Sequence, residues 1–227
     1  MEDFIKIFSA SKNIRIKSVF SHLASSEDKL NDVFTTSQFQ RFEEACRQLK
    51  QQLKIDFDRH ILNSAGIIRF PEHHYEMVRL GIGLYGIGYN ENHQQELQLA
   101  FKLKSKVTAI HKVYEGESIG YGRMGKAQTE ARIAIISIGY ADGLLRKAGQ
   151  GKFKLRIRDK YFPLIGNVCM DMCMVDLGQD NSIAVGDEVI IFEKTNDIYA
   201  LSEALETIPY EVLTNISGRV RRKYVQD

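Results

Sequence analysis

The sequence has few cysteines and no long apolar segment. Only three of its 227 residues are cysteine, and this small odd number argues against a disulfide framework. No apolar run reaches the roughly 18 residues that cross a bilayer. The first residues, MEDFIKIF, are acidic where a secretory signal would be basic. We therefore expect a cytoplasmic protein without a transmembrane segment.

The chain also lacks an excess of charge of either sign. Lys and Arg number 31, Asp and Glu number 29, and the formal net charge is +2. Such a balance gives no electrostatic reason to expect nucleic acid or an anionic membrane as a partner. Cys169 and Cys173 lie four residues apart, but no histidine is near enough in sequence to complete a metal site. We expect buried thiols and no bound metal.

The first half of the chain contains alternating strand and helix patterns. Residues 14–22 are typical of a buried strand, and residues 39–53 carry apolar side chains three and four apart, as in an amphipathic helix. Residues 60–66 and 81–88 are further strand candidates, with a short helix at 71–78 between them. This order predicts parallel strands joined by right-handed crossovers.

Three parallel strands are too few to form a sheet alone. Both edges would stay open, and a parallel sheet needs both faces covered. We therefore expect residues 1–95 to be the C-terminal part of an α/β barrel, with only the last strands of a (β/α)8 barrel present.

The second half, residues 96–227, follows a polar linker at 90–96 and changes to a period of two. Apolar and polar residues alternate in 101–113 and 153–158, and further strands are expected at 168–177 and 187–192. One helix is expected near 199–206. These patterns predict a β-rich second domain.

Several polar groups lie where strands of the first half would end. They are His22, Asn63, Ser64 and Arg79, with Gly81 and Ile82 close behind. Barrels place catalytic and phosphate-binding groups at the C-terminal ends of their strands. A hydroxyl, an amide and a glycine N–H together suit a phosphate monoester. Purely structural interpretations stay open: a structural histidine, an Asn-Ser turn, and an ion pair for the arginine.

Six segments, in order along the chain, resemble the successive motifs of the alanine racemase family. They are FSHLASSEDKL followed by QFQRF, HILNSAGIIRFPEHHYEMVRLGIGLYG, GESIGYG, ISIGYADG, GNVCMDMCMVDL and TIPYEVLTNISGRVRR. The resemblance implies a pyridoxal 5'-phosphate (PLP) enzyme that interconverts L-alanine and D-alanine and supplies D-alanine for peptidoglycan. It also implies an N-terminal α/β barrel followed by a β domain, in a head-to-tail homodimer with the active site shared between subunits.

The resemblance also implies roles for individual residues. Asn63, Ser64 and the amides of Gly81 and Ile82 match the family's phosphate cradle, and Tyr210 matches a phenol that also bonds the phosphate. For the ring of the cofactor, Arg79 matches the arginine on the pyridine nitrogen and His22 the histidine that orients it. Tyr121 matches the catalytic tyrosine, which acts at the cofactor of the other subunit. Met170 matches the position whose backbone meets the substrate carboxylate, and Tyr140 a position near the entrance.

One central element of the family pattern has no counterpart in these residues. The lysine that binds PLP belongs to a motif on the first barrel strand, and no lysine here has that setting. The resemblance thus covers the C-terminal portion of a racemase, which we expect to be inactive alone. The alternatives are a non-catalytic PLP-binding or dimerisation module, or the racemase end of a cell-wall ligase–racemase fusion. A related PLP decarboxylase is disfavoured because Arg79, and not a carboxylate, matches the pyridine partner.

Overall fold

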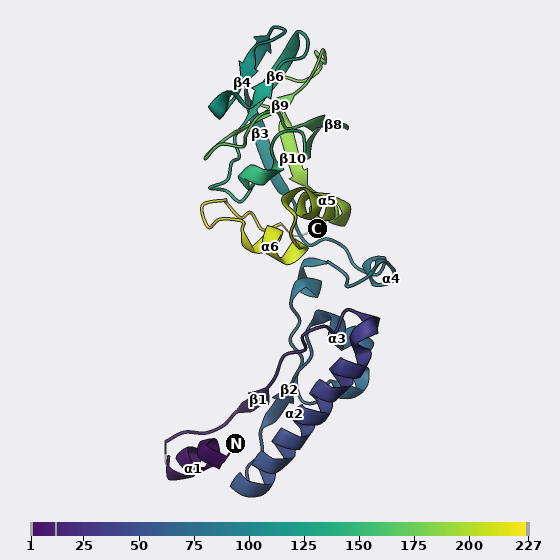
Figure 1. The fold of residues 1–227 in the computed structure, drawn as a ribbon, viewed down its shortest axis with the longest axis vertical. Coiled ribbons are helices and arrows are strands. Elements are labelled where there is room, and N and C mark those ends of the chain that lie inside the picture. Colours follow the sequence, from purple (N-terminus) through teal and green to yellow (C-terminus); the bar gives the residue numbers. More distant parts are fainter. Residues whose placement is uncertain (1, 12, 226–227) are drawn as a thin grey trace. The chain divides into compact units, whose positions relative to one another are not determined.

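The computed structural model describes residues 2–11 and 13–225, and the chain divides into two compact units, Met1–Ala100 and Phe101–Asp227. The first unit combines helices with a small parallel sheet, and the second is rich in antiparallel strands (Figure 1). Within the described residues, no helix is both long enough and apolar enough to span a bilayer.

Over residues 2–11 and 13–100, the first unit contains four helices and two strands. They are α1 (Glu2–Ala10), β1 (Ser18–Phe20), α2 (Asp32–Leu53), β2 (Asp58–His60), α3 (Ser64–Arg69) and α4 (Glu91–Gln94). Single 3-10 turns add Lys29–Asn31, Pro71–His73 and Ile82–Tyr85. β1 and β2 pair in parallel, as the sequence predicts, with Ser18 opposite Asp58 and Phe20 opposite His60.

The long helix α2 covers the strands of the first unit (Figure 1). Its buried face carries Phe39, Phe42, Cys46 and Leu49 at the spacing that predicted the helix, which in the structure begins earlier, at Asp32. These side chains pack with the fully buried residues that follow β2, among them Leu62. Burial of this apolar face is the main stabilising contribution within the unit.

The prediction of a strand at 81–88 is wrong. Ile82–Tyr85 form a 3-10 turn, and Gly86, at φ 83°, closes it. The backbone of Gln98 lies so close that a Cβ built on Gly86 would stand 1.8 Å from the Gln98 carbonyl oxygen. Glycine at every second or third position leaves too few side chains to pack a strand, and here it permits a tight turn.

The segments before that turn also differ from expectation. Of the strand expected at 60–66, only His60 belongs to β2, and Ser64 begins helix α3 because the Asn63 side chain caps it. The helix expected at 71–78 is a single 3-10 turn, Pro71–His73, and the backbone is left-handed at Tyr75 (φ 49°).

The second unit, as described up to residue 225, is built on a six-stranded antiparallel sheet with the order β8-β7-β10-β3-β6-β9. The strands are β3 (Leu103–Val113), β6 (Ala131–Ile136), β7 (Lys154–Ile157), β8 (Lys160–Pro163), β9 (Cys173–Asp176) and β10 (Glu188–Phe192). A small hairpin, β4 (Ser118–Ile119) and β5 (Gly125–Lys126), and two helices, α5 (Thr195–Leu205) and α6 (Pro209–Thr214), complete it. Strands thus occur in each segment where they were expected, within shorter bounds.

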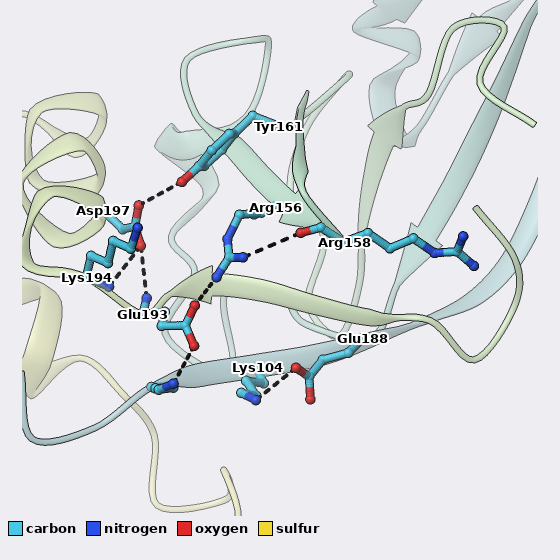
Figure 2. A network of polar contacts seen from close by, with 9 residues as sticks. Lys104, Arg156, Arg158, Tyr161, Glu188, Glu193, Lys194 and Asp197 are labelled. Atoms are coloured by element: carbon cyan, nitrogen blue, oxygen red, sulfur yellow. Dashed lines mark hydrogen bonds and ion pairs between the residues drawn. The ribbon is translucent and has the colours of Figure 1, made fainter. Parts of the chain in front are cut away.

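A network of ion pairs and hydrogen bonds joins α5 to the sheet (Figure 2). Glu193, just after β10, pairs with Arg156 of β7 and with Lys102. Asp197, in the first turn of α5, accepts the Glu193 backbone N–H at 3.0 Å and lies 3.4 Å from the Tyr161 hydroxyl. The helix that packs beside α6 is therefore fixed at its beginning.

Candidate active site

Arg79 is the most distinctive polar group of the first unit. Its guanidinium donates to Nδ1 of His60 (2.8 Å), to Nδ1 of His22 (3.1 Å) and to the carbonyl of Ser21 (2.8 Å). Further contacts reach the carbonyls of His60 (3.1 Å) and Ile61 (3.3 Å). Every one of these acceptors is neutral, and partial burial lowers the pKa of Arg79. The alternative of a structural ion pair finds no support, since no described carboxylate pairs with Arg79.

No role was predicted from the sequence for His60, which accepts a hydrogen bond from Arg79 just as His22 does. Because the guanidinium donates to both Nδ1 atoms, each ring carries its proton on Nε2. The His60 ring is buried and stacks on Phe20, and its Nε2 has no hydrogen-bond partner. Burial, then the nearby Arg79 charge, lower the pKa of His60. A signal was present in the sequence, because β2 ends at His60 and His22 lies two residues after the end of β1.

The residues expected to cradle a phosphate come together around the start of α3. Asn63 accepts the Gly66 N–H at 2.9 Å and the Ser26 hydroxyl at 2.7 Å. The Ser64 hydroxyl oxygen accepts the backbone N–H groups of Gly81 (2.9 Å) and Gly83 (3.2 Å). Because that oxygen already accepts twice, its own proton remains for donation to an acceptor outside this pair.

Tyr121 belongs to the second unit, in the turn between β4 and β5. Its side chain is 75% exposed, so burial contributes little to its position. Gly120 and Gly122 on either side have φ of 77° and 74°, conformations that residues with a Cβ rarely adopt. The two glycines therefore permit a tight turn that projects the phenol outward.

Tyr140 and Met170 lie on two adjoining loops of the second unit. The Tyr140 N–H donates to the Cys169 carbonyl (2.9 Å) and the Ala141 N–H to the Met170 carbonyl (3.0 Å). Arg219 connects the same loops, since it pairs with Asp142 (2.8 Å) and with Asp171 (2.5 Å). The loops of Tyr140 and Met170, two positions expected to contact the substrate, are therefore adjacent. The ion pairs of Arg219 hold these loops in place relative to each other.

Tyr210 lies in the first turn of α6, directly after Pro209, with its side chain about half exposed. The ten expected site residues therefore form two groups, one in each unit. The first holds the Arg79 cluster and the Ser64 turn, and the second holds Tyr121, Tyr140, Met170 and Tyr210. In the part of the chain that the structure describes, no three His, Cys, Asp or Glu side chains gather as a metal site.

Comparison with protein-family models gives two matches that together span most of the chain. Residues 1–88 match the model described as alanine racemase, N-terminal domain, and residues 100–224 match alanine racemase, C-terminal domain.

Curated proteins and solved structures agree with these matches. Alanine racemase 1 of Clostridium acetobutylicum is 40% identical over all of this chain and 60% of its own length, and alanine racemase of Clostridium tetani is 38% identical with the same coverage. The Clostridium difficile 630 enzyme in complex with cycloserine superimposes with a TM-score of 0.85 at 34% identity, over 97% of this chain and 60% of that one. Alanine racemase from Streptomyces coelicolor gives 0.89 at 26% identity, over 100% and 61%. The chain thus spans about 60% of the length of the curated relatives it matches.

Proposed function

Because the chain belongs to the alanine racemase family, we propose that it is part of a PLP-dependent enzyme that interconverts L-alanine and D-alanine. The observation that carries this proposal is the Arg79 cluster beside the Ser64 turn. In the part of the chain that the structure describes, neutral acceptors alone hold the guanidinium, and the nearby Ser64 hydroxyl has its proton available for donation. Together they form a site for a molecule that carries both an anionic group and a neutral acceptor.

These residues fit PLP in the roles that the family resemblance gives them. Asn63, Ser64, Gly81 and Ile82 would hold the phosphate, together with Tyr210. Arg79 would donate to the pyridine nitrogen, with His22 and His60 fixing its plane. When bound, PLP supplies the electron sink that makes the α-proton of alanine acidic.

Arg79 also favours racemisation over other reactions of an amino acid. A guanidinium keeps its own proton, so it donates a hydrogen bond without protonating the nitrogen it faces. An aspartate at this position would support a fully charged ring. The arginine therefore favours removal and return of a single proton and disfavours transamination.

Tyr121 would exchange that proton on one face of the substrate, with a lysine on the opposite face. A phenol with an ordinary pKa near 10 is a weak base at neutral pH, so nearby positive charge has to stabilise its anion. We propose that the partner subunit of a head-to-tail homodimer provides that setting. Met170 would meet the substrate carboxylate, and Tyr140 would border the entrance.

The proposed division of labour follows the two units. Residues 1–95 would form the C-terminal part of a (β/α)8 barrel that binds PLP, and residues 96–227 the β-rich domain that brings Tyr121. We place the activity in the cytoplasm, as the composition predicts. Since no lysine in these 227 residues matches the PLP-binding motif, we propose that the chain by itself does not racemise alanine.

The test joins this chain behind the N-terminal part of the Clostridium acetobutylicum relative that it does not match, and measures racemisation in both directions. We expect activity in the extended protein and none in the chain alone. Tyr121→Phe in the extended protein should lower the rate by about a hundredfold or more, the contribution of one acid–base group. Tyr114→Phe, at an exposed tyrosine of the same unit, is the matched control. Wild-type rates both ways in Tyr121→Phe would refute its assigned role.

A second candidate is a non-catalytic PLP-binding or dimerisation module, which the absence of a matching lysine favours. Equilibrium dialysis of the chain with PLP separates the cases. Binding that Arg79→Ala abolishes would indicate a formed site without lysine, and no binding at millimolar PLP would exclude the PLP-binding version of the module.

A further inference from the structure

Asn167 contacts the loop that carries Tyr121 with a buried side chain that is hydrogen-bonded at both ends. It lies between β8 and β9 and is 5% exposed. Its Nδ2 donates to the backbone carbonyl of Tyr121 at 3.2 Å. Its Oδ1 accepts from Nε2 of Gln150 at 3.0 Å.

The Tyr121 carbonyl sets the direction of the Asn167 amide, and Gln150 supports it. A backbone carbonyl only accepts, so Nδ2 of Asn167 faces Tyr121 and Oδ1 faces the Gln150 amide, which then donates from Nε2. Gln150 is anchored in turn, because its backbone N–H donates to the Gly166 carbonyl at 2.8 Å in a left-handed conformation (φ 59°). Nδ2 of Asn167 is therefore directed at Tyr121.

Besides the Asn167 amide, hydrogen bonds of the loop itself and close packing hold it. Its backbone turns at two glycines with positive φ, and the phenol itself is exposed. Within the loop, the Arg123 N–H donates to the Gly120 carbonyl at 3.1 Å, and Nε of Arg123 donates to the Ser118 hydroxyl at 3.1 Å. Close packing adds to this, since a Cβ on Gly120 would stand 2.4 Å from Cε of Met174. The Asn167 amide reaches the tyrosine's own backbone, where a shift changes the direction of the ring.

We propose that Asn167 is a positioning residue for Tyr121: it fixes the backbone of the tyrosine and thereby the direction in which the phenol points, with Gln150 holding its amide in the productive orientation. This inference rests on the proposed role of Tyr121. It adds Asn167, which lies outside the proposed cofactor site, to the residues that position the phenol.

The test uses the 227-residue chain and does not depend on activity. Asn167→Asp keeps the size of the side chain and the acceptor for Gln150 but removes the N–H that reaches Tyr121. At neutral pH we expect the Arg123 amide to exchange with solvent about fivefold faster, the factor that loss of one hydrogen bond corresponds to. The ring resonances of Tyr121, identified with Tyr121→Phe, should shift, while amides of β3 and β6 keep their rates. Asn181→Asp, an exposed asparagine of the same unit, makes the same change of charge and should have neither effect.

Gln150→Ala provides a second variant at an exposed position, in case a carboxylate at 167 prevents folding. It leaves Asn167 in place but removes the donor that supports its amide, so the same amide and ring should respond more weakly. Unchanged Arg123 exchange and Tyr121 resonances in a folded Asn167→Asp protein would overturn the proposal. If that variant does not fold, the same null result in Gln150→Ala would overturn it.

The extended enzyme gives a readout that a purely structural role would not produce. Misplacement of the phenol should lower kcat by about tenfold while KM changes less. Asn167→Asp added to Tyr121→Phe should lower kcat no further, because both changes act through one group. Additive losses would contradict positioning. If the extended wild-type enzyme shows no racemase activity, the proposed function fails, and the exchange and resonance results still decide the contact itself.

Discussion

At the scale of single residues, the arrangement around Arg79 sets the protonation of its neighbours. His60 accepts a hydrogen bond from the guanidinium and is buried against Phe20. Both burial and the positive charge disfavour a second proton on the ring, and only Asp58 acts in the opposite direction. The pKa of His60 is therefore below its usual 6.5. A protonated His60 would lose its acceptor and repel Arg79.

This predicts a pH dependence of stability in the first unit. When the folded pKa of a histidine is depressed, the unfolded chain binds the proton more readily, so the free energy of unfolding falls as pH drops below 6.5. Urea unfolding between about pH 5 and 8 should show this loss, and His60→Gln, which keeps an acceptor without titrating, should reduce it. The Glu76 carboxyl, whose pKa Arg59 lowers to about 2, titrates outside that window. A profile that is identical in His60→Gln would contradict the prediction.

At the scale of elements, helix α2 is stabilised by the burial of one of its faces. Phe39 is 2% exposed, stacks on His73 with ring centroids 3.7 Å apart, and meets the edge of Phe70 at 5.3 Å. Phe34 lies on the same helix and is 49% exposed. The same residue type therefore occupies a core and a surface position of one element.

Truncation of these two side chains should have very different costs. Phe39→Ala removes a buried ring and leaves a cavity, so the free energy of unfolding of the first unit should fall by about 3 kcal/mol. Phe34→Ala should change it by about 0.5 kcal/mol or less. Guanidinium unfolding followed by far-ultraviolet circular dichroism measures both. Equal losses would mean that the solvent-facing side of α2 is covered in solution.

At the scale of the whole molecule, the expected site residues fall in two units. In the proposed head-to-tail homodimer, the Arg79 cluster of one subunit would meet Tyr121 of the other. One chain would therefore contribute to two active sites, and each site would need two chains.

Mixed dimers of the extended enzyme test this sharing. Tyr121→Phe and Arg79→Glu place their defects in different units, so a mixed dimer contains one site with both defects and one site with neither. Dissociation and reassociation of equal amounts should restore about a quarter of wild-type activity, because half of the dimers are mixed and half of their sites are intact. A mixture no more active than its parents would show that each site is built within one chain.

The sequence by itself determined the elements whose signal is local. The spacing of Phe39, Phe42, Cys46 and Leu49 predicted α2, and the period of two predicted β3. The order of the motifs indicated the family, which the family models confirm, and suggested the roles that we propose for single residues. Periodicity failed at 81–88, where a backbone contact with Gln98 selects a turn.

Only the tertiary structure decided which groups meet. The hydrogen bonds of Arg79 to His22 and His60 join residues 57 and 19 positions apart, and Asn167 reaches Tyr121 across 46. Propensity and periodicity describe neighbours along the chain, whereas hydrogen bonds form between groups that folding brings together. The sequence thus supplied the arginine and the tyrosine, and the fold determined what holds each of them in place.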